Sequence, residues 1–123
     1  MGILNIDFPA RPTPATYRIA ENEIHDNSAL CPGEESGDPP LSGVGVLIVN
    51  ADRDRVEDNV ISTNRPARSI PLHGGVVLID LVGRAPSNNT ITSNELIRNR
   101  PNVVYDGSGH GNDFTRNHCV PTC

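Results

Sequence analysis

The stretch Asn22-Glu-Ile-His-Asp-Asn27 decides the fold, because close copies of it return three times along the chain. The copies begin at Asn59, Asn89 and Asn112, and each has asparagine at its first and sixth places and Ile or Phe at its third. Self-similarity of this kind is the signature of a repeat architecture, in which stacked units bury a continuous core. The distance between copies shortens along the chain, which indicates one winding path whose surface loops differ in length.

Apolar segments lie between the copies and align by the same logic. They are Gly45–Asn50, Gly75–Asp80 and Pro101–Asp106, and their Val, Ile and Leu residues favour strands. Turn-forming Pro, Gly, Asp and Asn residues separate these segments from the asparagine repeats. A β-solenoid requires a strand, a turn, a second strand and a second turn in each period. We therefore predict an all-β fold, a short right-handed parallel β-helix (solenoid) of about four coils.

The asparagine places have a physical explanation within such a coil. Asparagine tolerates left-handed backbone angles, so we expect it at the corners where the coil changes direction. Asparagine side chains stacked from coil to coil can also form a hydrogen-bonded ladder along the axis. The third places are expected to stack inside as one apolar column, which consists of Ile24, Ile61, Ile91 and Phe114.

These registered repeats resemble the right-handed parallel β-helix repeat superfamily (the pectin-lyase-like fold), especially its asparagine-rich periplasmic copper-protein and carbohydrate-binding relatives. The resemblance covers residues 17–119, which we expect to form the β-helix domain after an extended lead-in at 1–16 and before a tail at 120–123. Residues 28–43 are predicted to be an inserted loop. The resemblance implies a fold more than an activity, because the same coil supports lyases, hydrolases, epimerases, adhesins and inert spikes.

Composition excludes several classes of partner. The net charge of −5 and a pI near 5.2 argue against nucleic acid, since phosphate binding needs clustered Lys and Arg. No apolar run is long enough for a transmembrane helix, so no membrane partner is expected. No signal peptide is visible at the start, and an extracellular or cell-surface location is predicted. The three cysteines leave open a Cys119–Cys123 ring, a link from Cys31 to the tail, or three free thiols.

Candidate site residues lie at the ends of the aligned apolar strands. Asn50, Asp80 and Asp106 are expected in neighbouring coils about 5 Å apart, so the two aspartates could form the carboxylate pair of a polysaccharide-active enzyme. The predicted catalytic residues are Asp80, Asp106 and His110, and the predicted binding residues are Asn50, Arg84 and Tyr105. The competing interpretation is that an Asp or Asn after a strand simply holds the following turn. No dedicated metal site is predicted, although Asp52, Asp54, Asp80 and Asp106 could supply oxygen ligands to calcium.

Alternation in the apolar strands predicts a second, outward row. If Val46, Ile48, Val76 and Leu78 point inward, then Leu47, Val49, Val77 and Ile79 point outward, and Val103 and Tyr105 are expected to extend that outward row. An exposed aliphatic strip is costly in water and needs cover. The cover is expected from the Pro-rich lead-in, from the 28–43 loop or from another subunit, and a homo-oligomer is the favoured interpretation.

Two functions from different classes fit these features. The first is a non-enzymatic β-helix scaffold or binding domain that takes a glycan or a protein partner, either alone or as a fragment of a larger protein. The alternative is a polysaccharide lyase or hydrolase that uses Asp80 and Asp106. The short solenoid favours the scaffold, because a sugar-binding cleft generally needs more coils.

Overall fold

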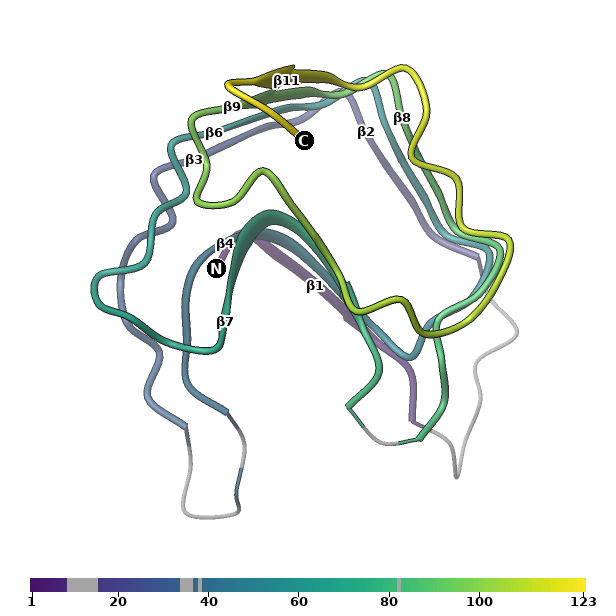
Figure 1. The fold of residues 1–123 in the computed structure, drawn as a ribbon, viewed down its shortest axis with the longest axis horizontal. Coiled ribbons are helices and arrows are strands. Elements are labelled where there is room, and N and C mark those ends of the chain that lie inside the picture. The colour runs from purple at the N-terminus through teal and green to yellow at the C-terminus, as the bar shows by residue number, and fades with distance from the viewer. Residues whose placement is uncertain (9–15, 34–36, 38, 82) are drawn as a thin grey trace.

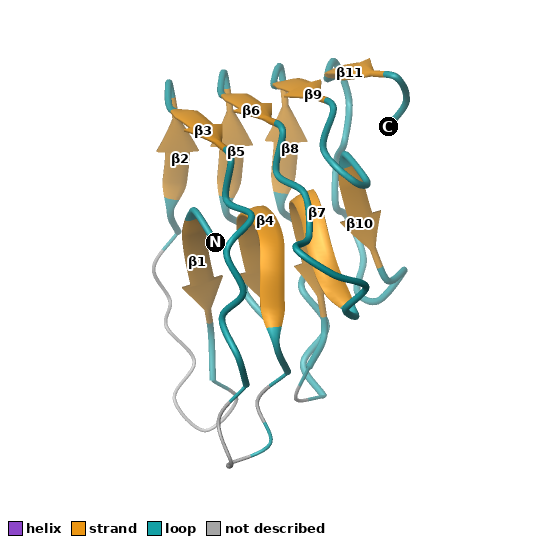
Figure 2. Ribbon diagram, turned by 90° about the vertical axis from the view of Figure 1, so that its left-hand side faces the viewer, coloured by secondary structure: helices purple, strands orange, loops and turns teal. Residues whose placement is uncertain are grey.

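The computed structural model describes residues 1–8, 16–33, 37, 39–81 and 83–123, and it winds them into a solenoid of four coils. Figure 1 looks along the solenoid and Figure 2 shows the coils side by side. The strands of the successive coils are β1 (Ile3–Ile6), β2 (Arg18–Ala20) and β3 (Glu23–His25); β4 (Leu41–Val49), β5 (Arg55–Glu57) and β6 (Val60–Ser62); β7 (Leu72–Ile79), β8 (Thr90–Thr92) and β9 (Glu95–Ile97); and β10 (Val103–Tyr105) and β11 (His118–Val120).

Three parallel sheets form the walls of this solenoid. Their strand orders are β1-β4-β7-β10, β2-β5-β8 and β3-β6-β9-β11, so every strand pairs with its counterpart one coil away. This arrangement confirms the predicted all-β parallel solenoid. The predicted lead-in contributes a strand, because β1 pairs with β4 and begins the first sheet. The Pro-rich residues 9–15 and residues 34–36 and 38 of the predicted loop lie outside the described residues.

The asparagine ladder is confirmed, and it corrects the alignment of the repeats. The backbone N–H and Nδ2 of Asn22 donate to Oδ1 of Asn59. Asn59 donates in the same way to Asn94, and Asn94 donates to Asn117, over separations of 37, 35 and 23 residues. Asn89, which the repeat pattern places above Asn59, instead stacks on Asp54. The pattern misleads because each coil carries corner residues at five-residue steps, so a copy fits equally well at either corner.

The inner core therefore contains two columns from these repeats where one was predicted. Strand register places Ile24, Ile61, Leu96 and Cys119 in one column. The second column consists of Ile19, Val56 and Ile91, with Phe114 continuing it in the last coil. The single column of Ile24, Ile61, Ile91 and Phe114 is wrong, because it mixes residues from two different sheets. Each column presents one apolar side chain per coil to the interior.

The left-handed corners are also displaced by one residue from their predicted places. The residue before each ladder asparagine adopts the positive φ: Glu21, Asp58, Ser93 and Arg116 have φ between 55° and 58°. The asparagine itself turns its side chain into the wall, where Asn59 and Asn94 are 1% exposed. The change of chain direction is thus made by the residue before the asparagine, which leaves the asparagine side chain free to bond to the neighbouring coils. The four residues with positive φ are all exposed and polar, and each is a different amino acid.

The first sheet is bent into an arch (Figure 1), and both faces of its middle strands β4 and β7 are buried. Its inner face contributes Val46, Ile48, Val76 and Leu78 to the main core, as predicted. Its outer face forms a second cluster in which Val44, Leu47, Val49, Val77 and Ile79 are at most 5% exposed. Val103 and Tyr105 do not extend this outer row, because their register partners Val76 and Leu78 point inward. Val104 packs against the outer cluster in their place.

The outer row is thus covered within the single chain. Met1, Leu41, Leu72 and Val104 pack against it. A second subunit is therefore not required to bury the part of this strip that lies on β4 and β7.

A glycine column, not singled out from the sequence, lets the arched sheet approach the ladder. A Cβ at Gly45 would lie 2.5 Å from the carbonyl oxygen of Gly75 and 2.7 Å from Cγ2 of Ile61. Gly2 and Gly75 occupy the corresponding places in the first and third coils and are equally crowded. A side chain at these places would push neighbouring coils apart, since real Cβ atoms do not approach so closely.

Candidate functional site

The strand-end corner after the arched sheet brings together several of the predicted site residues. Asn50 and Asp80 follow β4 and β7 in register, because Val49 pairs with Ile79. Asp106 sits one place out of step, since Tyr105 pairs with Leu78. Asn50 is fully buried, and its Oδ1 accepts a hydrogen bond from the backbone N–H of Leu81 at 3.0 Å. Asn50 is therefore placed as an internal bridge between coils.

The Asp106 carboxylate holds the turn around it. Oδ2 accepts a hydrogen bond from the backbone N–H of Asp80 at 2.8 Å, and Oδ1 accepts one from the backbone N–H of Ser108 at 2.8 Å. Burial acts to raise the pKa of Asp106, but the hydrogen bonds from Ser108 and Asp80 outweigh it and hold the pKa below its usual range. A carboxyl group that keeps a proton at neutral pH, as a general acid does, needs the opposite shift.

Asp80 serves the next turn in the same way. Its Oδ1 accepts hydrogen bonds from the backbone N–H groups of Gly83 at 2.6 Å and Arg84 at 3.0 Å. Asp80 and Asp106 therefore lie next to each other in space, as predicted, and their carboxylates accept hydrogen bonds from backbone N–H groups and, at Asp106, also from the Ser108 hydroxyl. The geometry is that of consecutive Asx-type turns.

Arg84 links three coils through ion pairs. Its guanidinium donates to Oδ2 of Asp52 at 2.7 Å and also to the carboxylate of Asp7. Hydrogen bonding to Asp52 and then to Asp7 raises the pKa of Arg84. Asp52 also accepts a hydrogen bond from the backbone N–H of Ser87 at 2.8 Å. The predicted binding arginine is thus held inside the corner, with its side chain 27% exposed.

Two residues of this corner were missed in the sequence. Asp7 follows β1 as Asn50 follows β4, because Ile6 pairs with Val49. The mainly apolar segment Ile3-Leu-Asn-Ile6 before Asp7 was the signal that could have revealed it. Asn5, in the same strand, donates a hydrogen bond from Nδ2 to the Asp54 carboxylate.

Asp54 occupies a ladder place that is asparagine in the later coils. Its Oδ1 accepts a hydrogen bond from the backbone N–H of Tyr17 at 2.8 Å, and its own N–H donates to Oδ1 of Asn89 at 2.9 Å. Asp54 is 1% exposed, and burial raises its pKa despite the hydrogen bonds from Tyr17 and Asn5. Asp54 is thus a buried carboxyl group within the wall, close to Asp52 and Asp7.

His110 and Tyr105 belong to the last coil. Nδ1 of His110 lies 3.4 Å from Oγ of Ser87, a long hydrogen bond, and the residue is exposed. The Tyr105 hydroxyl donates to the carbonyl oxygen of Ser108 and accepts a hydrogen bond from Nδ2 of Asn112 at 3.2 Å. The Tyr105 ring centroid lies 5.3 Å from that of Phe114. No hydrogen bond or ion pair among the described residues joins His110 to Asp80 or Asp106.

Hollows lie at the two ends of the solenoid. The hollow at the first coil is lined by Gly2, Ile3, Asn22, Glu23, Ile24, His25 and Asn27. The hollow at the last coil is apolar and is lined by Val103, Tyr105, Phe114, Asn117 and Cys123. Within the described part of the chain, no group of three or more His, Cys, Asp or Glu residues is arranged to hold a metal ion.

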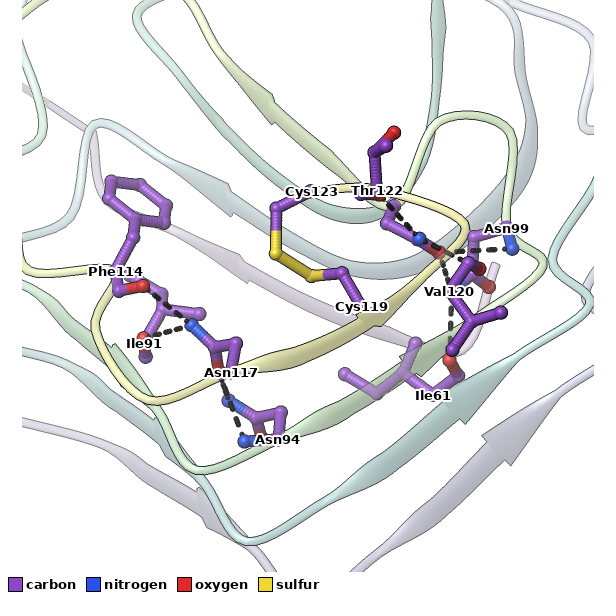
Figure 3. Close-up of a disulfide and its surroundings, with 11 residues drawn as sticks. Ile61, Ile91, Asn94, Asn99, Phe114, Asn117, Cys119, Val120, Thr122 and Cys123 are labelled. Carbon is purple, nitrogen blue, oxygen red and sulfur yellow. Dashed lines mark hydrogen bonds between the residues drawn. A yellow bond between two sulfur atoms is a disulfide. The ribbon is translucent and has the colours of Figure 1, made fainter.

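The disulfide Cys119–Cys123 closes the last coil (Figure 3). Of the three cysteine arrangements that the sequence allowed, the structure has the small Cys119–Cys123 ring. Cys31 is exposed as a free thiol. Beside the ring, Asn102 supplies the last rung of the Asn27–Asn64–Asn99 ladder, because its Oδ1 accepts from the N–H and Nδ2 of Asn99. The chain thus folds back to end the ladder only three residues after Asn99.

Comparison with known proteins identifies one family. Residues 14–119 match the sequence profile of the family described as periplasmic copper-binding protein (NosD), a family of right-handed β-helices. No curated protein and no solved structure matches the chain. The periplasmic description agrees with the predicted location outside the cytoplasm. In the part of the chain that the structure describes, no helix is long and apolar enough to cross a membrane.

Proposed function

Because the chain belongs to the NosD family of periplasmic copper-binding proteins, we propose that it acts as a non-enzymatic β-helix binding scaffold outside the cytoplasm. The observation that carries the proposal is that the polar side chains at the strand-end corner are bonded to other groups of the protein. The carboxylates of Asp80 and Asp106 accept hydrogen bonds from backbone N–H groups, and Arg84 is paired with Asp52 and Asp7. Groups that fix turns in this way support a rigid framework more than a reaction.

Copper, named in the family's description, does not fit the described residues. Copper sites in proteins draw on His, Cys and Met ligands. His25, His73, His110 and His118 lie on four separate segments, next to Asp26, Ile70, Ser87 and Glu95 respectively. Cys119 and Cys123 are bonded to each other, and no group of three candidate ligands occurs among the described residues. The described residues therefore offer copper no set of ligands.

The ligand we propose for the scaffold is a glycan. The outward face of the β2-β5-β8 sheet carries planar charged groups: Arg18 donates to Glu57 at 2.5 Å, and Arg55 lies beside both. The side chains of Arg18 and Arg55 are exposed, and guanidinium groups can form paired hydrogen bonds with uronate carboxylates. Calorimetry with uronate oligosaccharides tests it, and Arg18→Ala should abolish the heat of binding.

The alternative function is a polysaccharide lyase or hydrolase that uses the Asp80–Asp106 pair. It requires that the carboxylates leave their turns when substrate binds. The unmodified protein, Asp80→Asn and Asp106→Asn should be incubated with uronate-containing glycans, and released chain ends and melting temperature should be measured together. For a scaffold, no chain ends appear, and Asp106→Asn lowers the melting temperature because the turn loses an ionised acceptor.

The exposed Asp58→Asn variant serves as the matched control, since that carboxylate sits at a solvent-facing corner. Depolymerisation by the unmodified protein that disappears in folded Asp106→Asn would overturn the scaffold proposal in favour of the enzyme.

A further inference from the structure

The asparagine ladder has a direction, and the two ends of the solenoid therefore differ. Each rung donates its N–H and Nδ2 to the Oδ1 of the next coil, from Asn22 through Asn59 and Asn94 to Asn117. At the first coil, Oδ1 of Asn22 accepts no hydrogen bond from the described residues. At the last coil, the backbone N–H of Asn117 donates none to them. In this ladder the acceptor at one end matches the donor at the other, whereas the Asn27–Asn64–Asn99 ladder ends within the chain at Asn102, whose Nδ2 donates to the carbonyl oxygens of Val120 and Thr122.

The strand edges at the two ends match in the same sense. Val103 pairs with Val76, Val76 pairs with Val46, and Val46 pairs with Ile3. Strands β10 and β1 therefore occupy equivalent places in the last and first coils. On the outer face, the same register aligns Val104 with Leu4. Leu4 is 43% exposed, while its counterparts in the middle coils are covered by neighbours on both sides. A further coil below β1 would cover it in the same way.

Charges at the two ends are complementary in three separate columns. Arg18 and Asp113 lie at the two opposite ends of a column of paired residues that runs along the β2-β5-β8 sheet. Glu21 and Arg116 end the column of left-handed corners. Glu23 and His118 end a column of the β3-β6-β9-β11 sheet. All six side chains belong to exposed residues. When the last coil of one molecule meets the first coil of another, each column juxtaposes an Asp or Glu with an Arg or His.

We infer that copies of this chain stack head to tail, with the last coil of one molecule seated on the first coil of the next. The occupant of the open first coil is a second copy, because the ladder polarity, the strand register and the column charges all match the chain's own last coil. Such a contact is heterologous, so it extends into an open row of molecules unless an end is blocked. It also covers strand edges, which otherwise invite unspecific pairing.

A charge-swap experiment on the Glu21–Arg116 column tests this inference. Arg116→Glu places two glutamates at every junction, and Glu21→Arg places two arginines there. Each single variant should weaken the apparent association constant roughly fivefold, from the loss of an exposed pair and the gain of a like-charge contact. Equal mixtures of the two variants, and the double variant Glu21→Arg/Arg116→Glu, restore opposite charges at every junction and should recover the original association. Sedimentation velocity over a concentration series in low salt measures all four.

Controls come from the middle of the same solenoid. Asp58→Arg lies in the same corner column and Arg98→Glu lies at the neighbouring corner, and both residues are exposed away from the ends. These variants change the net charge as the test variants do, but they should leave association unchanged. A strictly monomeric unmodified protein at millimolar concentration would overturn the inference. So would association that survives Arg116→Glu, or a double variant that fails to recover.

Discussion

Replacing Asn94 by alanine should remove a large part of the folding free energy. Its Nδ2 donates to the carbonyl oxygens of Val56 at 2.8 Å and Thr92 at 3.0 Å and to Oδ1 of Asn117 at 3.0 Å. Its Oδ1 accepts from the backbone N–H and the Nδ2 of Asn59. The residue is 1% exposed, so water cannot replace these partners without opening the wall.

The magnitude follows from the partners left behind. An intramolecular hydrogen bond contributes about 1 kcal/mol net, and a buried group left without a partner costs about 1–3 kcal/mol. Because Nδ2 has only two hydrogens for its three acceptors, four independent bonds are the most that can be counted, and we expect a loss of about 3–5 kcal/mol. A domain of this size has a total stability of about 5–15 kcal/mol. The variant should therefore be close to unfolding.

Urea unfolding, followed by circular dichroism at concentrations too low for association, measures the effect. Asn22→Ala is the matched control, because Asn22 is exposed and its Oδ1 accepts from none of the described residues. We expect it to cost about 0.5 kcal/mol or less. Asn117→Ala, at a half-buried rung, should fall between the two. Equal losses for Asn94→Ala and Asn22→Ala would refute the view that the ladder holds the coils together.

Further predictions concern packing, titration and the terminal ring. Gly45→Ala should destabilise the fold by about 1–3 kcal/mol, because its Cβ would lie 2.5 Å from a carbonyl oxygen; an unchanged melting temperature would contradict the crowding. Since burial raises the folded-state pKa of Asp54 above its usual 3.8, its contribution to stability is full below that pH and is lost as pH rises through the folded pKa. Asp54→Asn should therefore gain stability over the unmodified protein at pH 7 and lose the advantage near pH 3, as melting curves across this range can show. Asp106 has a lowered pKa, so Asp106→Asn should show the opposite sign, with a deficit at pH 7 that disappears in acid. Reducing Cys119–Cys123 should cost about 2 kcal/mol or less, because the closed ring is short, and urea midpoints with and without reductant check this.

The solenoid could be predicted because its determinants are local and repeated. Asparagine recurring around a β-branched residue marks a corner, a strand and a second corner without reference to any distant partner. The correct stacking of the coils could not be predicted with the same ease. Asp54, Asn59 and Asn64 form one set of five-residue steps, so Asn89 fits the pattern at either of two corners. Only the hydrogen bonds between coils decide that it stacks on Asp54.

The positions of the candidate site residues could be predicted from the sequence, whereas their hydrogen-bond partners could not. Sequence placed Asp80 and Asp106 at neighbouring strand ends, and the structure brings them together there. Apart from the Ser108 hydroxyl, the donors identified at their oxygens are backbone N–H groups, which every residue except proline carries, so the residue pattern does not reveal them. The pairing of Arg84 with Asp7 spans 77 residues and depends on β1. That strand was hidden in a lead-in too short to show a repeat.

Because the ladder asparagines of successive coils are equivalent, the ladder would accommodate the deletion or insertion of a whole coil. Asn59 and Asn94 follow corners of the same left-handed conformation, at Asp58 and Ser93, and they make the same bonds above and below. Excising residues 59–93 would join Asp58 directly to Asn94 and present every remaining coil with a partner of the same shape. The ladder itself would allow the chain to lengthen or shorten by whole coils, whereas contacts peculiar to one coil, such as those of Arg84 with Asp7 and Asp52, would be lost with that coil.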